Sequence, residues 1–221
     1  MIVTQVGDEC WPLNEDGVWI ELRQLAQTEA GPVLFLDRDG VVNEDTDHVC
    51  DPKDIVLMSG AAELIATVNR QDIPVAVITN QSGIDRGIFQ WSDFAAVTSR
   101  IDALLAVEGA HIDAIAACPF HPDFTPAYSA RQDRWRKPQP QMILAIAEYL
   151  NADLRASWMV GDRARDIEAA RAAGLGGGVR LTGDGDTVAS YDGKFRVVPI
   201  ARIAMCLSLL ENMFRDRHEA S

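Results

Sequence analysis

Three features of the sequence predict an α/β fold built on a mainly parallel sheet. Short apolar runs without polar alternation occur at residues 33–36, 74–79 and 158–160, and such runs are typical of strands buried on both faces. Segments with apolar residues at helical spacing separate these runs. Polar residues and glycine follow the runs, at the edge of the sheet where ligands bind in open α/β folds. Strands alternating with helices imply right-handed crossovers.

The first 31 residues precede the first strand of this pattern. We therefore expect an N-terminal extension over residues 1–31 and an α/β domain over residues 32–221. Two short apolar runs between residues 10 and 20 flank the sequence Asn-Glu-Asp-Gly at 14–17, which predicts a hairpin turn. Residues 21–27 are compatible with one or two helical turns. An appendage that covers an edge of the sheet, or that contacts another subunit, is a simpler interpretation than a functional domain.

From residue 33 onward the elements follow in a regular order. The predicted strands cover residues 33–37, 74–79, 112–118, 157–160, 179–181 and 196–198. The first predicted helix opens at Ser59-Gly60. The further predicted helices cover residues 92–107, 138–150, 162–173 and 200–214. Ser92 suits an N-cap, Pro138 suits a first helical position and Gly174 suits a helix stop. A proline-rich irregular stretch at 119–136 interrupts the alternation.

Composition narrows the functional classes. The 221 residues carry a net charge of −13, which disfavours non-specific binding to nucleic acid or to an anionic membrane because both require a cationic surface. The four cysteines, at 10, 50, 118 and 206, form no close pair, so neither a disulfide framework nor a zinc knuckle is indicated. The N-terminus lacks the pattern of a signal peptide, and the apolar stretches are too short to span a bilayer. A cytoplasmic protein is expected.

Asp37 and Asp39 emerge at the end of the first predicted core strand, and Gly40 permits a sharp turn after them. Two carboxylates so close together repel each other unless a cation lies between them, and a divalent metal is the simplest such cation. A carboxylate can attack phosphorus, and a second acid can protonate the leaving oxygen and then deprotonate water. On its own, Asp-x-Asp after a strand is also typical of a turn or an N-cap.

Three further polar segments end strands or open helices. Residues 79–83, Thr-Asn-Gln-Ser-Gly, offer hydroxyl, amide and backbone donors to phosphate, and Arg86 adds a cation nearby. Arg136-Lys137 places two cations before a predicted helix, where lysine is suited to a phosphoryl group or an aspartate. Asp162 follows a strand as Asp37 does, and Asp166 lies one helical turn beyond it. Each segment alone has an ordinary structural interpretation, but together they supply nucleophile, phosphate donors, cation and metal ligand.

In this order and spacing the four segments resemble the haloacid dehalogenase superfamily of aspartate-nucleophile phosphatases, over roughly residues 33 to 200. The string TNQSGIDRG at 79–87, together with Cys118-Pro119 and Arg136-Lys137-Pro138, resembles the branch that acts on heptose bisphosphate and histidinol phosphate. The resemblance implies a Rossmann-like three-layer α/β/α sandwich and Mg²⁺. We expect no large cap domain, because residues 39–58 and 118–136 are each only about twenty residues long.

The resemblance also implies roles for individual residues. It implies these catalytic residues: Asp37 as nucleophile, Asp39 as general acid and base, and Thr79 and Lys137 as holders of the phosphoryl group. It implies these metal ligands: Asp37, the backbone carbonyl of Asp39 and Asp162, with Asp166 in support. It implies these substrate contacts: Asn80, Arg86 and Arg136.

One segment departs from the branch pattern. Members often carry a zinc loop, with Cys-x-His and later Cys-x-Cys just before Arg-Lys-Pro. Here Cys118 is kept, but Phe120 takes the histidine position and Asp133 and Trp135 take the cysteine positions. Tetrahedral zinc needs four good ligands, so we expect no structural zinc. Packing of aromatic side chains is then expected to hold the loop, namely of Phe120, Phe124 and Trp135.

The leading functional hypothesis is a Mg²⁺-dependent phosphomonoester hydrolase that forms an aspartyl-phosphate and acts on D-glycero-D-manno-heptose 1,7-bisphosphate or a similar sugar phosphate. The alternatives are a histidinol phosphate phosphatase, a nucleic-acid end phosphatase and a non-catalytic phosphosugar-binding protein. The acidity argues against nucleic acid, and a pure binder has no need of Asp39. The expected partner is a small phosphorylated metabolite, and the expected state is a monomer or weak homo-oligomer.

Overall fold

The computed structural model describes residues 4–6, 9–24, 26–46, 49–183, 190–192 and 195–214. In this part of the chain a sheet of eight strands has the order β3-β6-β5-β4-β7-β8-β10-β9. Its strands are β3 (Trp19–Leu22), β4 (Leu34–Leu36), β5 (Val75–Asn80), β6 (Ala114–Cys118), β7 (Trp158–Gly161), β8 (Gly177–Leu181), β9 (Ser190–Asp192) and β10 (Phe195–Ile200). The central strands pair in parallel, while the edge strands β3 and β9 are antiparallel to their neighbours.

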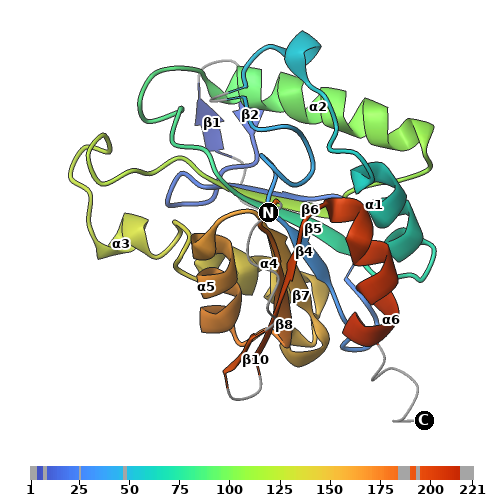
Figure 1. The fold of residues 1–221 in the computed structure, drawn as a ribbon. Coiled ribbons are helices and arrows are strands. Elements are labelled where there is room, and N and C mark those ends of the chain that lie inside the picture. The colour runs from blue at the N-terminus through green and yellow to red at the C-terminus, as the bar shows by residue number, and fades with distance from the viewer. Residues whose placement is uncertain are drawn as a thin grey trace.

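Helices cover both faces of the sheet, giving the predicted three-layer α/β/α sandwich (Figure 1). One face is covered by α1 (Ala61–Asn69), α2 (Trp91–Val107), the 3₁₀ segment η3 (Ile203–Leu209) and the short α6 (Leu210–Met213). The other face is covered by α4 (Gln141–Leu150) and α5 (Ala164–Ala173). The remaining described elements are the hairpin strands β1 (Thr4–Val6) and β2 (Glu9–Trp11), the helix α3 (Ala130–Asp133), and the 3₁₀ turns η1 (Pro52–Asp54) and η2 (Leu154–Ala156).

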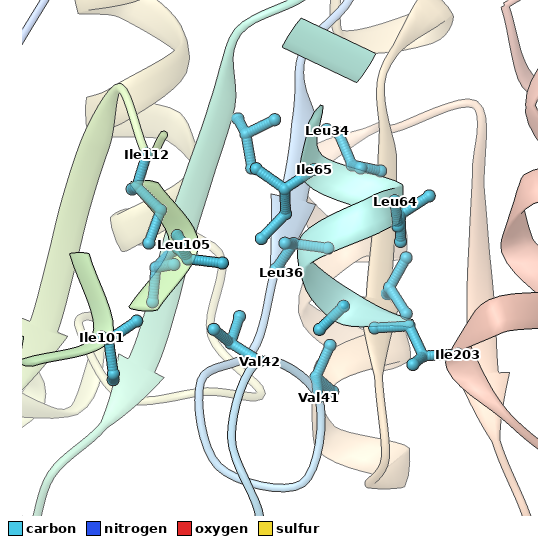
Figure 2. Packing of buried hydrophobic residues seen from close by; sticks show 14 of the residues in the cluster. Leu34, Leu36, Val41, Val42, Leu64, Ile65, Ile101, Leu105, Ile112 and Ile203 are labelled. Atoms are coloured by element: carbon cyan, nitrogen blue, oxygen red, sulfur yellow. The ribbon is translucent and has the colours of Figure 1, made fainter. Parts of the chain in front are cut away.

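The strand at the centre of the sheet shows why its sequence is apolar throughout. Leu34 and Leu36 of β4 pack into the cluster beneath α1 and α2, as Figure 2 shows, whereas Phe35 packs on the opposite face. All three side chains are fully buried, because successive residues of a strand point to opposite faces and both faces are covered. This burial fixes the strand end from which Asp37 projects.

Every strand predicted from residue 33 onward is present, with ends shifted by no more than a few residues. The first helix begins after Gly60 and the helix α5 stops at Gly174, which has a left-handed backbone with φ +84°. Both of these predicted boundaries are confirmed.

Four helix predictions were wrong in detail. The N-cap of α2 is Gln90, not Ser92, because Gln90 and Asp93 form a reciprocal capping box. The helix α4 begins at Gln141 rather than Pro138, since a residue that precedes a proline, here Gln139 before Pro140, disfavours helical geometry. The helix α5 begins at Ala164 rather than residue 162, and the Asp166 carboxylate accepts from the Arg163 amide at 2.9 Å just before it. Residues 200–214 contain the end of β10 and mainly 3₁₀ structure instead of one helix.

The N-terminal residues contribute directly to the main sheet. The expected hairpin turn at 14–17 is present, with a hydrogen bond from the Gly17 amide to the Asn14 carbonyl. Instead of the predicted helical turns, Glu21 and Leu22 belong to β3, which pairs with β6 along the edge of the sheet. Residues 1–31 therefore include the edge strand of the main sheet.

No large cap domain is present in the described part of residues 39–58 and 118–136. Apart from the end of β6 at Cys118, the elements assigned to the described residues of these segments are the turn η1 and the four-residue helix α3. Among the described residues, no helix is both long enough and apolar enough to cross a membrane.

Candidate active site

The strands β5, β4 and β7 lie side by side and bring three polar segments to one edge of the sheet. Leu36 pairs with Val77 on one side and with Val160 on the other. The Asp37 amide donates to the Val160 carbonyl at 3.0 Å, so Asp37 continues the strand into the site. Because parallel strands end together, Asp37 and Asp162 meet as the sequence predicted, and Thr79 is linked to Asp39 through Gln81.

Lys137 is the buried cation of the site. Its Nζ lies 2.9 Å from Asp37 Oδ1 and 2.7 Å from Asp166 Oδ1, and it donates to the Ile78 carbonyl at 2.7 Å. Burial alone would lower the pKa of Lys137, but the two carboxylates outweigh burial and raise that pKa above its ordinary value. The ammonium therefore stays charged and holds both acids in place.

Asn80 positions this lysine. Its side-chain oxygen accepts from the Lys137 amide at 3.0 Å, and its side-chain nitrogen donates to the Lys137 carbonyl at 3.1 Å. Asn80 was predicted as a substrate contact. Both ends of its amide bond to the Lys137 backbone, and its role toward substrate stays a prediction.

Three carboxylates converge beside Lys137. In the part of the chain that the structure describes, Asp37, Asp162 and Asp166 form one group whose ligand oxygens all lie within 4.8 Å of one another. Two glycines permit this approach, since a Cβ on Gly40 would lie 2.8 Å from Asp162 Oδ2 and one on Gly161 would lie 2.3 Å from Asp166 Cβ. A compact set of carboxylate oxygens at a solvent-reachable strand end is the donor set that Mg²⁺ prefers. The residues present therefore fit this ion.

The charges of Asp37, Asp162 and Asp166 also favour a bound cation. Burial raises the pKa of Asp37 to about 7, against the attraction of Lys137 and with the repulsion of Asp166. Burial also raises the pKa of Asp162 above its ordinary value, although the adjacent Arg163 guanidinium opposes the shift. Lys137 and Arg163, whose Nε lies 2.9 Å from Asp162 Oδ2, supply two positive charges against three acids, and a divalent cation would supply the missing positive charge.

The Asp39 carboxylate is surrounded by hydrogen-bond donors other than Lys137. It accepts from Arg38 at 3.1 Å through both Nε and Nη2, and from Asn43 at 3.0 Å. Gln81 bridges Asp39 and Thr79, donating at 2.8 Å and 2.9 Å. Burial alone would raise the pKa of Asp39, but the Arg38 guanidinium and the hydrogen bonds from Asn43 and Gln81 lower it below its ordinary value.

These partners of Asp39 were not assigned roles from the sequence. Arg38 is 4% exposed and its guanidinium stacks over Phe94 at 5.3 Å, so a charged side chain is held inside the fold. The position of Arg38 between two aspartates was the available signal for a charge partner. No sequence pattern indicated that Gln81 would connect Asp39 to Thr79.

The two predicted substrate arginines lie on the loops around the site. Arg86 stacks on the ring of Phe124 at 4.8 Å, and Arg136 donates to the Phe120 carbonyl at 2.8 Å. Both therefore contact the segment at 119–136. Their role toward substrate stays a prediction.

Aromatic packing holds the 119–136 loop only in part. Phe120 and Trp135 are buried as predicted, but Phe124 is 45% exposed and stacks with Arg86 instead of entering the core. Polar contacts add to the packing, since the Thr125 hydroxyl donates to Asp85. The expected lack of a structural zinc stays a prediction.

Comparisons with known proteins agree with this site. A family model described as HAD-hydrolase-like matches residues 134–199. The D-glycero-beta-D-manno-heptose-1,7-bisphosphate 7-phosphatase of Mesorhizobium japonicum is 40% identical over 209 residues, covering 93% of this chain and 94% of that protein. The enzyme of the same name from Yersinia pestis is 36% identical over 170 residues, covering 74% of this chain and 90% of that protein.

Solved structures show the same relationship. A crystal structure of a HAD-like phosphatase from Mesorhizobium loti has a TM-score of 0.80 and 40% identity, covering 94% of this chain and all of that one. The D,D-heptose 1,7-bisphosphate phosphatase from B. bronchiseptica, crystallised with magnesium and phosphate, has a TM-score of 0.68 and 33% identity, covering 82% of this chain and 99% of that one.

Fold, site and relatives together place this chain among the HAD-like hydrolases. Within that class it belongs to the phosphatase family that includes the heptose bisphosphate phosphatases. The resemblance inferred from the four motifs is thereby confirmed, and the chain is a phosphatase.

Proposed function

We propose that this chain is a Mg²⁺-dependent phosphatase that removes the 7-phosphate of D-glycero-D-manno-heptose 1,7-bisphosphate. The observation that carries the proposal is the placement of Asp37 between Lys137 and two further carboxylates at the strand end. The names of relatives that match nearly the whole chain support the substrate. Magnesium and phosphate bound to the related B. bronchiseptica phosphatase support these two ligands for this kind of site.

The reaction proceeds in two steps, the formation of an aspartyl-phosphate at Asp37 and its hydrolysis. A carboxylate oxygen of Asp37 attacks phosphorus, the bond from phosphorus to the sugar oxygen breaks, and Asp39 gives that oxygen a proton. Asp39 then takes a proton from water, the water oxygen attacks phosphorus, and the Asp37 carboxylate is restored as inorganic phosphate leaves. A nearby anionic phosphoryl group raises the pKa of a carboxyl, which favours the protonated form of Asp39 once substrate is bound.

Several side chains are proposed to bind or stabilise the phosphoryl group during its transfer. Bound Mg²⁺ at Asp37, Asp162 and the Asp39 carbonyl would stabilise the negative charge that develops on the phosphoryl oxygens. Lys137 adds a fixed positive charge at the same place, and Thr79 offers a hydroxyl that Gln81 orients. Asp166 holds Lys137 from the far side. Arg86 and Arg136 are proposed to contact the substrate outside the reacting phosphate.

Other sequence-based expectations accompany this proposal. The net charge of −13 argues against nucleic acid or an anionic membrane as partner. The expected partner is a small phosphorylated metabolite. A cytoplasmic location and a monomeric or weakly oligomeric state stay predictions.

A substrate panel tests the proposed function. Purified protein with Mg²⁺ is assayed on heptose 1,7-bisphosphate, histidinol phosphate and a 5′-phosphorylated oligonucleotide, and ³¹P NMR identifies which phosphate of the bisphosphate is released. We expect the highest kcat/KM on the heptose bisphosphate, with loss of the 7-phosphate. A higher kcat/KM on histidinol phosphate or on the oligonucleotide contradicts the proposal.

Magnesium should stabilise the protein more at high pH than at low pH. The pKa of Asp37 is raised from 3.8 to about 7 in the metal-free fold, so ionising this group costs stability. The stability that the protonated Asp37 carboxyl contributes is fully present below its ordinary pKa of 3.8, and it is lost as the pH rises through about 7. Mg²⁺ competes with the proton, so its apparent affinity falls by about tenfold for each pH unit below that pKa.

Thermal unfolding with and without Mg²⁺ at pH 5.5 and pH 8 measures this effect. We expect the rise in Tm caused by Mg²⁺ to be clearly larger at pH 8. Asp162→Asn, which removes a ligand oxygen and its charge, should abolish most of the rise. An equal rise at the two pH values would contradict the assignment of Asp37 as a metal ligand that titrates.

A further inference from the structure

Asp16 lies in the N-terminal hairpin turn, far along the chain from the catalytic motifs, yet its side chain is only 5% exposed. The turn presents it in a fixed direction, because Asn14 Oδ1 accepts from the Asp16 amide and from the Val18 amide, both at 3.0 Å. Gly17 completes the turn with φ +84°, a left-handed conformation that favours glycine.

The Asp16 carboxylate has three side-chain partners in the described residues, and all of them come from the helix α3 and the two residues that follow it. Its Oδ2 accepts from Trp135 Nε1 at 2.8 Å and from Arg134 Nη2 at 2.5 Å, and its Oδ1 accepts from Arg131 Nε. Burial alone would raise the pKa of Asp16, but hydrogen bonds from Arg134, Trp135 and Arg131 lower it to about 2. The carboxylate is thus charged across the working pH range.

These partners differ in what they contribute. Arg131 and Arg134 are 60% and 52% exposed, and ion pairs of exposed arginines contribute little. Trp135 is 6% exposed, so its indole N–H has few alternatives to Asp16. A hydrogen bond from a buried donor to a charged acceptor is among the stronger contacts in proteins.

Trp135 connects this contact to the active site, because the next two residues in the chain are Arg136 and Lys137. Lys137 is fixed independently by Asn80, Asp37 and Asp166. The Arg136 side chain instead donates to the Phe120 carbonyl, within the same loop. The path of the loop therefore affects Arg136 far more than it affects Lys137.

We propose that Asp16 is a positioning residue that fastens the 119–136 loop to the turn at residues 14–17. It thereby positions Arg136 to contact the part of the substrate that lies outside the reacting phosphate. This inference rests on the proposed function for the identity of the substrate. The fastening itself depends only on the contacts between Asp16 and the end of the loop.

The first test measures the fastening without any substrate. Trypsin cleaves after arginine, and Arg131 and Arg134 lie in the segment that Asp16 contacts, just before Trp135. Loss of a hydrogen-bonded charged partner should open the loop often enough to speed cleavage at these two sites by about tenfold in Asp16→Ala. Glu15→Gln is the matched control, because it removes a neighbouring carboxylate of the same turn. Mass spectrometry of the fragments locates the cuts.

The second test measures the effect on turnover. We expect KM for heptose 1,7-bisphosphate to rise by about tenfold in Asp16→Ala, because a misplaced arginine loses binding energy at the far end of the substrate. The kcat/KM for p-nitrophenyl phosphate, which needs only the phosphoryl machinery, should change by less than about twofold. Asp16→Asn, which keeps an acceptor for the indole, should lie between wild type and Asp16→Ala.

A variant from the other side of the contact keeps the proposal testable if Asp16→Ala folds poorly. Trp135→Phe removes the indole N–H and keeps an aromatic ring. It should reproduce the rise in KM. Adding Asp16→Asn to it should cause little further loss, because the hydrogen bond that Asn weakens is already absent in Trp135→Phe and the exposed arginine pairs contribute little. Additive losses would overturn the proposal.

Two other outcomes would also overturn it. One is unchanged tryptic cleavage in Asp16→Ala, and the other is an equal loss of kcat/KM on the sugar bisphosphate and the aryl phosphate. If wild-type protein does not hydrolyse the bisphosphate, the proposed function fails, whereas the tryptic test still decides whether Asp16 fastens the loop.

Discussion

Replacing the nucleophile should abolish turnover while the fold survives. Asp37→Asn is expected to lower kcat by about 10⁴-fold or more, in the range found when a catalytic nucleophile is removed. The amide has nearly the same shape and still accepts a hydrogen bond from Lys137, but it cannot form an acyl-phosphate. The measurement is kcat with p-nitrophenyl phosphate and with heptose 1,7-bisphosphate, alongside thermal unfolding.

The matched control for this variant is Asp54→Asn, which makes the same chemical change at an exposed position in the nearby polar segment. It should retain wild-type kcat. Activity near the wild-type level in folded Asp37→Asn would contradict the assignment of Asp37 as nucleophile.

Replacing the buried lysine should damage both activity and stability. Lys137→Met leaves Asp37 and Asp166 without their shared ammonium, and both carboxylates are almost fully buried. Breaking a buried ion pair from one side typically costs about 3–5 kcal/mol of folding free energy. Loss of one fixed charge from a phosphoryl site should lower kcat by about 10²–10³-fold.

The stability loss should depend on conditions in a way that identifies its cause. In EDTA at pH 8 the Asp37 carboxyl, whose pKa is raised to about 7, tends to ionise beside Asp166, and the loss should be largest. At pH 5.5 protonation of Asp37 relieves the repulsion, and at pH 8 Mg²⁺ binding does so. Lys53→Met, at an exposed position, is the control and should have little effect. Urea unfolding across these conditions measures the difference. A loss of the same size in all of them would mean that Lys137 acts through packing alone.

Much of the site was predictable because its residues lie at strand ends. Asp37, Thr79 and Asp162 each follow an apolar run, and parallel strands bring such positions together without any knowledge of distant contacts. The fold class followed from the same runs. Helix starts were less predictable, since reciprocal capping by Gln90 and Asp93, for example, competes with a nearby serine that looks like a cap.

The rest of the site depends on contacts between distant parts of the chain. The family resemblance implied a substrate contact for Asn80, but it did not indicate that the Asn80 amide pairs with the backbone of Lys137, 57 residues away. Asp16 reads as an ordinary turn residue, and its contact with Trp135 spans 119 residues. Such pairings arise from tertiary packing, and no local pattern encodes them.

The central claim is that Asp37 carries the phosphoryl group during turnover, and chemical trapping tests it most directly. Wild-type protein is mixed with Mg²⁺ and heptose 1,7-bisphosphate, quenched in acid and treated with borohydride, which reduces an aspartyl-phosphate to homoserine. Peptide mass spectrometry should then find homoserine at position 37, and none there in Asp37→Asn or without substrate. Homoserine at another aspartate, or at none while phosphate is being released, would contradict the account.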